Sequence, residues 1–273
     1  MSPLACAVRG CELPLERRER TLVCPRRHSY DVARRGYVNL LQPQDRRSLS
    51  PGDSKIAIAA RARLLASGVG RPILDAFVAR AEALGLHQEA VVCDLGCGSG
   101  DALGDLAARR PITGIGIDLS TAAIAHASQR FPRLTWVVAN VDRRLPLLTR
   151  SVDLVLSLHA RRNPAECARV LLAGGFLFVA VPAPDDLIEL REWTQGTARA
   201  RDRANALLAE HDALFTLMDR WTVRNRQHLE RDQLLDVLRG TYRGARASQA
   251  ASVHSLAAMD VTMASDLFLF QRT

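Results

Sequence analysis

The chain has 273 residues, of which 48% are hydrophobic and 24% are charged, and its formal net charge at pH 7 is +8. These proportions are those of an ordinary globular protein and exclude a disordered or collagen-like chain. No run of about 18 apolar residues is present, which argues against a membrane-spanning helix. The N-terminus is rich in arginine and has no apolar signal region, so the sequence predicts a cytoplasmic protein with no membrane partner.

The positive charge is concentrated at one end of the chain. Residues 1–70 hold 13 Lys and Arg residues against 6 Asp and Glu residues, whereas residues 71–273 hold 24 against 23. A basic segment on a nearly neutral chain is typical of contact with a polyanion such as nucleic acid. Arginine-rich codon usage is the alternative explanation, since Lys55 is the only lysine. It does not explain why cations outnumber acids in this segment.

Three of the six cysteines lie near the N-terminus. Cys6 and Cys11 form one pair, and Cys24 is followed four residues later by His28. Without a signal peptide, a disulfide framework is not expected. Three thiolates and an imidazole supply the tetrahedral ligand set of a closed, structural Zn²⁺ site, and a short segment with few apolar residues needs such an ion to fold. The alternative is that these are unrelated thiols and a surface histidine.

The zinc-binding module is expected to cover residues 1–45. Residues 46–88 are expected to contain a linker and two helices, because the run 46–54 is rich in turn-forming residues. Asp53 or Ser54 is placed to cap the first of these helices.

The second helix is expected over about 72–85. From residue 89 to residue 273, short apolar segments alternate with helices, which predicts a doubly wound α/β domain. Residues 185–240 are expected to form a mostly helical insertion. The expected strands are 90–95, 112–117, 135–139, 152–158 and 174–181, followed by two final strands at 261–263 and 266–270.

A glycine-rich turn follows the first expected strand. Asp94 is followed by Gly96, Gly98 and Gly100 in a D-x-G-x-G-x-G pattern, and Asp118 ends the second strand. Glycine lets the backbone turn sharply and approach a ligand without obstruction by a Cβ atom. A carboxylate at the position of Asp118 can accept the hydroxyls of a ribose. Because the spacing differs from G-x-G-x-x-G, a nicotinamide dinucleotide is the less favoured alternative.

Residues 88–181 resemble the class I S-adenosylmethionine-dependent methyltransferases, which have a Rossmann-like domain with a mostly parallel sheet of seven strands. The resemblance implies that S-adenosylmethionine binds along the glycine-rich turn, with its ribose on Asp118 and its adenine near residues 140–142. N-methylation needs no covalent intermediate, so Cys97 is expected to pack rather than to act as a nucleophile. The implied cofactor-binding residues are Asp94, Gly96, Cys97, Gly98, Ser99, Gly100, Asp118, Leu119, Asn140, Val141 and Asp142.

The segment 24–41, which includes the run GYVNLL, resembles the zinc-bearing start of the 23S rRNA (guanine-N1)-methyltransferases. Segment 51–54, followed by Ala60 and Arg61, and segment 182–190 match the same family, so the resemblance runs along most of the chain. It implies a structural Zn²⁺ and methyl transfer from S-adenosylmethionine to N1 of a guanine in hairpin 35 of 23S rRNA. The family includes housekeeping and macrolide-resistance enzymes, and it usually has two residues rather than four between the first two cysteines.

The resemblance also implies that the zinc module grips RNA beside the catalytic cleft. N1 is accessible only in an unpaired or flipped guanine, which commonly stacks on an aromatic ring or an arginine. The candidate RNA contacts are Arg34, Arg35, Tyr37, Arg46 and Arg47. The alternatives are that Tyr37 belongs to the core and that the arginines form a solvated surface.

His159 is the candidate catalytic residue. Guanine N1 carries a proton at neutral pH, so its methylation needs a proton acceptor. His159 ends the fourth expected strand, close to the expected methyl donor, and a neutral imidazole suits this role. The family tends to have an aromatic-Ala-Pro sequence here, whereas this chain has Leu158, His159 and Ala160, so the role is not part of the resemblance. Packing or phosphate binding is the alternative.

Two other functions are also compatible with the sequence. One is a non-catalytic rRNA-binding or assembly factor that keeps the fold, and the other is a small-molecule methyltransferase, for which a basic zinc module would be superfluous. The insertion at 185–240 is expected either to shape an RNA channel or to form a homodimer surface. The sequence does not distinguish a housekeeping role from antibiotic resistance.

Overall fold

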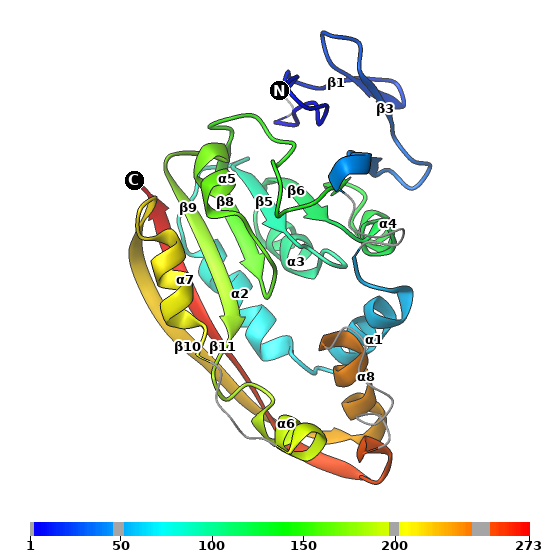
Figure 1. The fold of residues 1–273 in the computed structure, drawn as a ribbon, viewed down its shortest axis with the longest axis vertical. Coiled ribbons are helices and arrows are strands. Elements are labelled where there is room, and N and C mark those ends of the chain that lie inside the picture. The colour runs from blue at the N-terminus through cyan, green and yellow to red at the C-terminus, as the bar shows by residue number, and fades with distance from the viewer. Residues whose placement is uncertain (1–2, 46–51, 197–201, 242–251) are drawn as a thin grey trace.

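The computed structural model describes residues 3–45, 52–196, 202–241 and 252–273. A small sheet near the N-terminus stands at one end of a larger α/β body (Figure 1). The small sheet pairs antiparallel in chain order, and its strands are β1 (Glu16–Arg18), β2 (Thr21–Val23) and β3 (Ser29–Asp31). None of the described helices combines the length and the apolar character that a membrane span requires.

The body is built on an eight-stranded sheet. In spatial order its strands are β10 (Phe215–Glu230), β11 (Ala258–Arg272), β9 (Leu171–Pro182), β8 (Val152–Leu158), β5 (Val91–Leu95), β6 (Thr113–Asp118), β7 (Thr135–Val138) and β4 (Val38–Asn39). The six strands from β9 to β4 run parallel, whereas β11 is antiparallel to β9 and β10 is antiparallel to β11. This order confirms the predicted doubly wound, mostly parallel sheet and adds the two-residue strand β4 at its edge.

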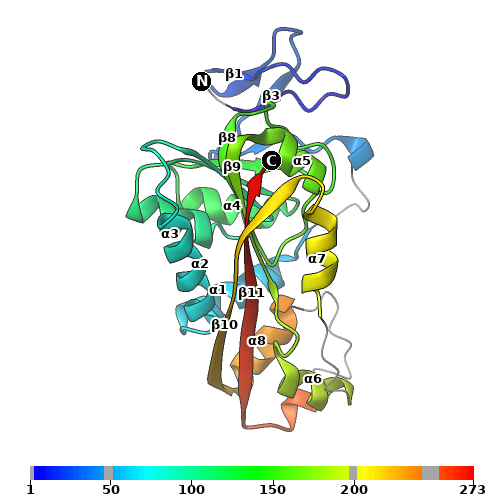
Figure 2. The ribbon, with the colours of Figure 1, turned by 90° about the vertical axis from the view of Figure 1, so that its left-hand side faces the viewer.

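Helices cover both faces of this sheet (Figure 2). They are α1 (Lys55–Ala66), α2 (Arg71–Glu82), α3 (Asp101–Arg109), α4 (Thr121–Arg130), α5 (Pro164–Val170), α6 (Ile188–Gln195), α7 (Ala204–His211) and α8 (Arg231–Thr241). On one face, α2, α3 and α4 bury Phe77, Leu103 and Ile124 in one apolar cluster. On the other face, α5 and α7 bury Val170 and Leu207 in a second cluster.

The outer ends of β10 and β11 extend beyond the sheet and carry a separate group of helices (Figure 1). α1, α6 and α8 pack there around a third apolar cluster, to which they contribute Leu64, Leu190 and Leu234. The strands contribute Leu229 and Val261 to the same cluster. Burial of these side chains stabilises this group of helices and fixes the position of α1, whose Arg61 side chain reaches the glycine-rich turn.

Ser54, rather than Asp53, caps α1. The Oγ atom of Ser54 accepts a hydrogen bond from the N–H of Ala57 at 3.2 Å, which satisfies one of the free donors at the start of the helix. α2 follows at Arg71, with proline in its first turn. Both predicted helices are therefore confirmed.

Two predictions about the C-terminal region are wrong. The sequence predicts a mostly helical segment over 185–240, but the 16 residues of β10 lie within it. Exposure alternates along much of β10, yet polar residues such as Asn225 and Gln227 occupy the less exposed positions and hide the strand pattern. The two short strands expected at 261–263 and 266–270 are one strand, because Ala264 and Ser265 continue the pairing with β10.

Candidate zinc and cofactor sites

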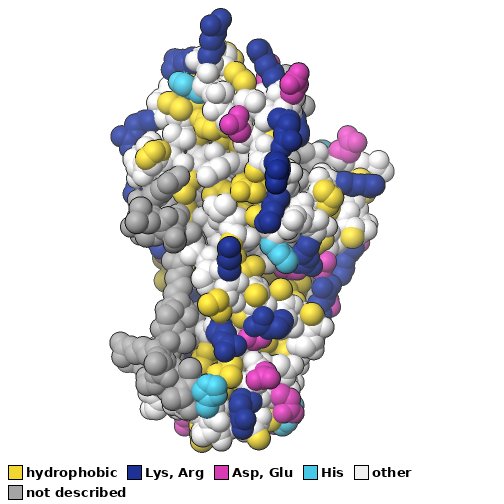
Figure 3. Space-filling view, turned by 90° about the vertical axis from the view of Figure 1, so that its right-hand side faces the viewer, with side chains coloured by type: hydrophobic (Ala, Val, Ile, Leu, Met, Phe, Trp, Pro, Cys, Tyr) yellow, Lys and Arg dark blue, Asp and Glu magenta, His cyan; other side chains and the backbone are white. Residues whose placement is uncertain are grey.

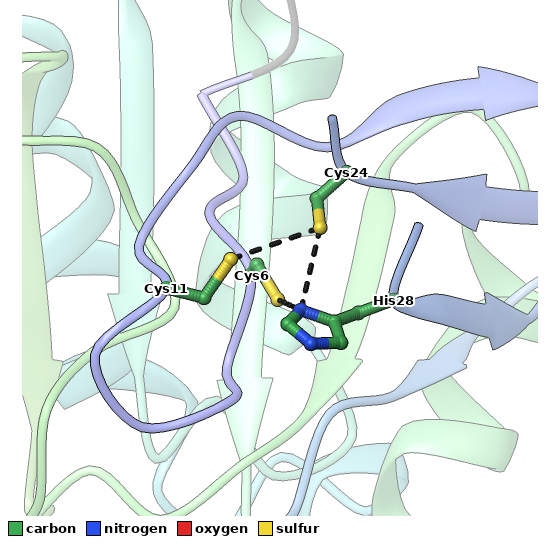
Figure 4. Close-up of side chains that lie close together, drawn as sticks. All are labelled: Cys6, Cys11, Cys24 and His28. Carbon is green, nitrogen blue, oxygen red and sulfur yellow. Dashed lines mark hydrogen bonds between the residues drawn. The ribbon is translucent and has the colours of Figure 1, made fainter. Parts of the chain in front are cut away.

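The four residues predicted to bind zinc lie together beside the small sheet (Figure 4). The sulfur atoms of Cys6, Cys11 and Cys24 and one ring nitrogen of His28 all lie within 4.8 Å of one another. The Nδ1 atom of His28 is 3.4 Å from the sulfurs of both Cys6 and Cys24, and 3.7 Å separates the sulfurs of Cys11 and Cys24. Three thiolates and an imidazole at these separations fit a tetrahedral Zn²⁺, and such a four-ligand site is structural because no position is left for a substrate.

A turn accommodates the wide spacing of the first cysteine pair. The N–H of Cys11 donates to the carbonyl of Val8 at 3.0 Å, and Gly10 has φ +72°, a left-handed conformation that glycine adopts readily. In the second pair, the N–H of Arg27 donates to the carbonyl of Cys24 at 2.8 Å. Each pair thus lies on one turn that presents two ligands to one ion.

Tyr30 supports the zinc site from outside the ligand set. Its hydroxyl lies 3.2 Å from the sulfur of Cys6, to which it can donate, and accepts a hydrogen bond from the N–H of Ala7 at 3.1 Å. Burial raises the pKa of Cys6 to about 11. A metal ion is therefore needed to hold this sulfur as a thiolate near pH 7, and the hydroxyl of Tyr30 orients it.

The zinc-binding module docks on the loop that follows β7. The N–H of Ala5 donates to the carbonyl of Pro146 at 2.9 Å. Leu4 is buried in the same apolar cluster as Leu147 and the buried side chains of α5 and α7. The module and the body therefore share one core.

The glycine-rich turn packs closely against its neighbours. A Cβ atom on Gly100 would lie 2.2 Å from Cη2 of Trp136, and one on Gly96 would lie 2.4 Å from the Cβ of Ala160. Both glycines also have positive φ. These positions require glycine for space and for backbone conformation, whereas the nearest atom to a Cβ on Gly98 would be 3.9 Å away.

Asp118 is held by backbone groups of the turn and of the residues that follow it. The N–H of Gly98 donates to one carboxylate oxygen at 3.0 Å, and the N–H of Ser120 donates to the other at 2.7 Å. Burial raises the pKa of Asp118, and these two hydrogen bonds oppose that rise. Each oxygen has a second lone pair, so the carboxylate can also accept two ribose hydroxyls.

The environment of the Asp94 carboxylate shows whether the residues of this turn suit S-adenosylmethionine. Asp94 is only 2% exposed, and its carboxylate makes no hydrogen bond to any of the described residues. Burial, with smaller effects of Asp118 and Asp101, raises the pKa of Asp94 well above its usual range. A buried acid without a partner beside a glycine-rich turn suits a cationic ligand group. S-adenosylmethionine carries an ammonium and a sulfonium, so the residues fit this cofactor.

The three residues expected near the adenine lie together after β7, but protein contacts engage their side chains. The amide of Asn140 donates to the carbonyl of Asp45 and accepts from the N–H of Asp142, both at 3.0 Å. The carboxylate of Asp142 pairs with Arg161 at 3.1 Å, and Val141 is buried in the core. Contacts from these residues to a base would therefore come mainly from backbone groups.

The remaining predicted cofactor residues line or support the turn. Cys97 and Ser99 are buried within it, and Leu119 packs against the core beneath it. Burial, together with the charges of Asp94 and Asp118, raises the pKa of Cys97 well above its usual range. The thiol of Cys97 is therefore protonated at neutral pH, which agrees with a packing role.

His159 lies at the end of β8 in a left-handed conformation, with φ +54°. Its neighbour Ala160 contacts Gly96, which places the histidine beside the glycine-rich turn. The Nε2 atom of His159 lies 2.7 Å from the Oγ atom of Ser265 on β11. The imidazole reaches solvent, but neighbouring protein atoms displace much of the water around it. This desolvation, and to a smaller extent the positive charge of Arg203, lowers the pKa of His159 to about 4. His159 is therefore neutral at pH 7.

The predicted RNA contacts fall into three groups. Arg34 and Arg35 are exposed in the turn between β3 and β4, whereas the ring of Tyr37 is partly buried against the body. Arg46 and Arg47 lie outside the described residues.

Further exposed arginines extend this basic surface over the small sheet. Figure 3 shows Lys and Arg side chains at that end of the molecule and also lower on the same face. The further arginines are Arg9, Arg17, Arg18, Arg20, Arg26 and Arg27. In the part of the chain that the structure describes, neither these arginines nor Arg34 and Arg35 form an ion pair. By contrast, many body arginines, such as Arg169 with Glu166, are paired. Unpaired cations are available to phosphates.

Sequence reasoning missed several residues of these sites. Tyr30 could have been suspected from its position two residues after His28. Ser265 is a polar residue inside an apolar strand pattern, which is a usable signal for a buried hydrogen bond. Nothing in the sequence pairs Trp136 with Gly100, because that contact depends on the neighbouring positions of α3 and β7 in space.

Comparison with solved structures identifies the fold of the body. The YcgJ protein of Bacillus subtilis has a TM-score of 0.51 at 16% identity, over 72% of this chain and 97% of that chain. The [4+2]-cyclase SpnF has a TM-score of 0.51 at 19% identity, over 74% of this chain and 80% of that chain. At these identities the likeness shows the fold alone, and the cyclase illustrates that one fold carries different reactions.

Comparison with protein families and curated proteins is more specific. A family model described as "RlmA, N-terminal", a zinc ribbon, matches residues 5–49, and one described as "Methyltransferase domain" matches residues 92–175. The 23S rRNA (guanine(748)-N(1))-methyltransferase of Streptomyces fradiae is 36% identical over 227 residues, which cover 82% of this chain and 80% of that protein. The zinc ligands, the glycine-rich turn and this similarity agree, and the chain belongs to the family of 23S rRNA (guanine-N1)-methyltransferases.

Proposed function

We propose that this chain transfers the methyl group of S-adenosylmethionine to N1 of a guanine in 23S rRNA. One observation carries the proposal: two sites for this reaction lie in one folded unit. The zinc-binding module, with its unpaired arginines, shares an apolar core with the body. In the body, the buried carboxylate of Asp94 lies without a partner beside the glycine-rich turn. The relative from Streptomyces fradiae is named for this activity. Because its substrate would be ribosomal RNA, we place the enzyme in the cytoplasm.

The cofactor would lie along the carboxyl ends of β5, β6 and β7. When bound, S-adenosylmethionine supplies an electrophilic methyl group on a sulfonium. Asp94 would face its positive charge, and Asp118 would accept the ribose hydroxyls. Gly96 and Gly100 give the turn its tight conformation against Ala160 and Trp136, and the segment 140–142 would border the adenine. The main contribution of these residues is orientation of the methyl group toward the base.

His159 is proposed to accept the N1 proton of guanine. If Nε2–H donates to Ser265, the lone pair of Nδ1 is free to take this proton. As the N1–carbon bond forms and the sulfur–carbon bond breaks, the proton passes to Nδ1 and then to water. The products are N1-methylguanine and S-adenosylhomocysteine, and the histidine returns to its neutral form.

The basic surface of the zinc module is proposed to bind RNA. Arg34 and Arg35 would contact phosphates, as would Arg46 and Arg47, and the accessible part of Tyr37 would stack on a base. We propose hairpin 35 as the region that contains the target guanine. Self-association through residues 185–240 is a separate proposal, which sedimentation of the purified protein tests.

Tritium transfer tests the proposed reaction. The full chain is mixed with tritiated S-adenosylmethionine and either 23S rRNA that lacks the modification or small-molecule acceptors such as guanosine. The proposal predicts labelled RNA and unlabelled guanosine. Cofactor binding without label in RNA would favour the non-catalytic alternative, and label only in small molecules would favour a small-molecule methyltransferase. Either result would overturn the proposal.

A further inference from the structure

Arg61 extends from α1 toward the glycine-rich turn, although Gly98 lies 37 positions later in the chain. Its Nη2 atom donates to the carboxylate of Asp53, and its Nε atom donates to the carbonyl of Gly240 at 3.0 Å. These two contacts come from the segment before α1 and from α8. They fix the guanidinium in one plane, which a single ion pair would not do.

The remaining nitrogen of Arg61 faces the turn. Nη1 lies 3.9 Å from the position that a Cβ atom on Gly98 would take, and it has no hydrogen-bond partner among the described residues. The N–H of Gly98 donates to Asp118, so Nη1 and the proposed ribose-binding carboxylate lie on the same part of the turn. The side chain of Arg61 is 38% exposed, so a ligand can reach it.

The charges around the turn indicate which ligand group this nitrogen would meet. Asp94 and Asp118 are acidic and suit the cationic and hydroxyl groups of S-adenosylmethionine. The amino-acid end of this cofactor also carries a carboxylate, which those two acids would repel. The charge of Arg61 lowers the pKa of Asp118 slightly, by less than the nearby charge of Asp53 raises it, as expected of a cation at the edge of the same site.

We propose that Arg61 binds the α-carboxylate of S-adenosylmethionine through Nη1, while Asp53 and the carbonyl of Gly240 hold its guanidinium in position. The inference rests on the proposed use of this cofactor. It assigns α1, which no sequence motif connected with the glycine-rich turn, to the binding site. It also makes the packing of α1 on α8 a determinant of cofactor affinity.

Arg63 provides a matched control two residues further along α1. Its guanidinium makes two hydrogen bonds to the carboxylate of Asp236 on α8, at 2.7 and 2.6 Å. It therefore contributes a similar ion pair to the same helix packing without facing the glycine-rich turn.

Calorimetric binding of two ligands separates a carboxylate contact from a general effect on the fold. The ligands are S-adenosylmethionine and its decarboxylated analogue, which keeps the ammonium and sulfonium but lacks the carboxylate. We expect Arg61→Gln to raise the Kd of S-adenosylmethionine about 10- to 100-fold, the range for a charged hydrogen bond, and to change the Kd of the analogue less than about twofold. The Kd of S-adenosylmethionine for Arg61→Lys should lie between the values for Arg61→Gln and the wild type. Arg63→Gln should change the Kd of neither ligand.

Two results would overturn the inference while leaving the proposed function intact. In one, Arg61→Gln and Arg61→Lys weaken both ligands equally, which would mean that Arg61 only supports the fold. In the other, Arg61→Gln binds S-adenosylmethionine as tightly as the wild type does. If the wild type bound neither ligand, the proposed function would fail together with the inference, so the two failures are distinguishable.

Discussion

The Nε2 atom of His159 lies 2.7 Å from the hydroxyl oxygen of Ser265, although 106 positions separate the two residues in the chain. The contact joins the end of β8 to β11, across β9. Ser265 has no exposed surface, so its hydroxyl is a fixed partner for the imidazole. The pair can therefore orient His159 toward a guanine, as the outer member of a catalytic pair orients a base.

Loss of the imidazole is expected to slow methyl transfer without changing cofactor binding. His159→Gln should lower kcat about 10²- to 10³-fold, since it removes the proposed proton acceptor. Ser265→Ala should lower kcat roughly fivefold, the equivalent of one hydrogen bond of about 1 kcal/mol. Single-turnover kinetics with saturating RNA measure both. His87→Gln is the control, because His87 pairs with Asp153 on the surface. Unchanged kcat in His159→Gln would refute the role.

Asp94→Asn is expected to stabilise the free protein and to weaken cofactor binding. Burial raises the pKa of Asp94 above its unfolded value of about 3.9. The contribution of Asp94 to folding is therefore fully present below about pH 4 and is lost as pH rises toward the folded pKa. At neutral pH the buried carboxylate lowers stability, and a neutral amide avoids this cost.

Thermal unfolding at pH 5.5 and pH 8 tests whether the buried carboxylate of Asp94 lowers the stability of the free protein as the pH rises. The advantage in Tm of Asp94→Asn over the wild type should be larger at pH 8, and S-adenosylhomocysteine should raise the Tm of the variant less than that of the wild type. A free variant that is less stable than the wild type at pH 8 would contradict the expectation.

The zinc ligands and the five parallel strands β5 to β9 could be predicted from the sequence because each depends on short local patterns. Cys6, Cys11, Cys24 and His28 carry distinctive chemistry, and the parallel strands are nearly continuous apolar runs. β10 was missed because it pairs only with β11, and its polar residues are tolerated on an edge strand.

The contacts that complete the site depend on distant segments. Arg61 meets the glycine-rich turn because the third apolar cluster holds α1 against α8, and Ser265 meets His159 because β11 inserts between β9 and β10. The turn at Gly10 brings Cys6 and Cys11 to one site despite the four residues between them, and their spacing alone does not reveal this backbone conformation. Such juxtapositions follow from tertiary packing, not from local pattern.

Alanine at two glycines of the turn should have unequal effects. In Gly100→Ala the new Cβ would meet Trp136 at 2.2 Å in addition to the strain of positive φ, so a loss of roughly 2–4 kcal/mol in unfolding free energy is expected. In Gly98→Ala the nearest atom is 3.9 Å away, so only backbone strain of about 1 kcal/mol is expected. Denaturant unfolding compares them, and equal losses would show that the contact with Trp136 is unimportant.

Removal of a zinc ligand or of its supporting hydroxyl should release the ion. Cys24→Ser should leave the purified protein without its one equivalent of zinc and lower its Tm, because the metal is part of the folding free energy. Tyr30→Phe should weaken zinc about 10- to 100-fold in competition with a chelator. Tyr37→Phe, in the same module, should retain zinc as the wild type does. Equal zinc affinity of Tyr30→Phe and Tyr37→Phe would exclude the supporting role of Tyr30.

The most direct test of the proposed reaction is the position of the methyl group in RNA. N1-methylation blocks Watson–Crick pairing, so reverse transcription stops one nucleotide before the modified guanine. After incubation of unmodified 23S rRNA with the enzyme and S-adenosylmethionine, we expect one new stop in hairpin 35 and N1-methylguanosine by mass spectrometry of that fragment. A methyl group on another atom or another base, or no methyl group in 23S rRNA, would contradict the proposed function.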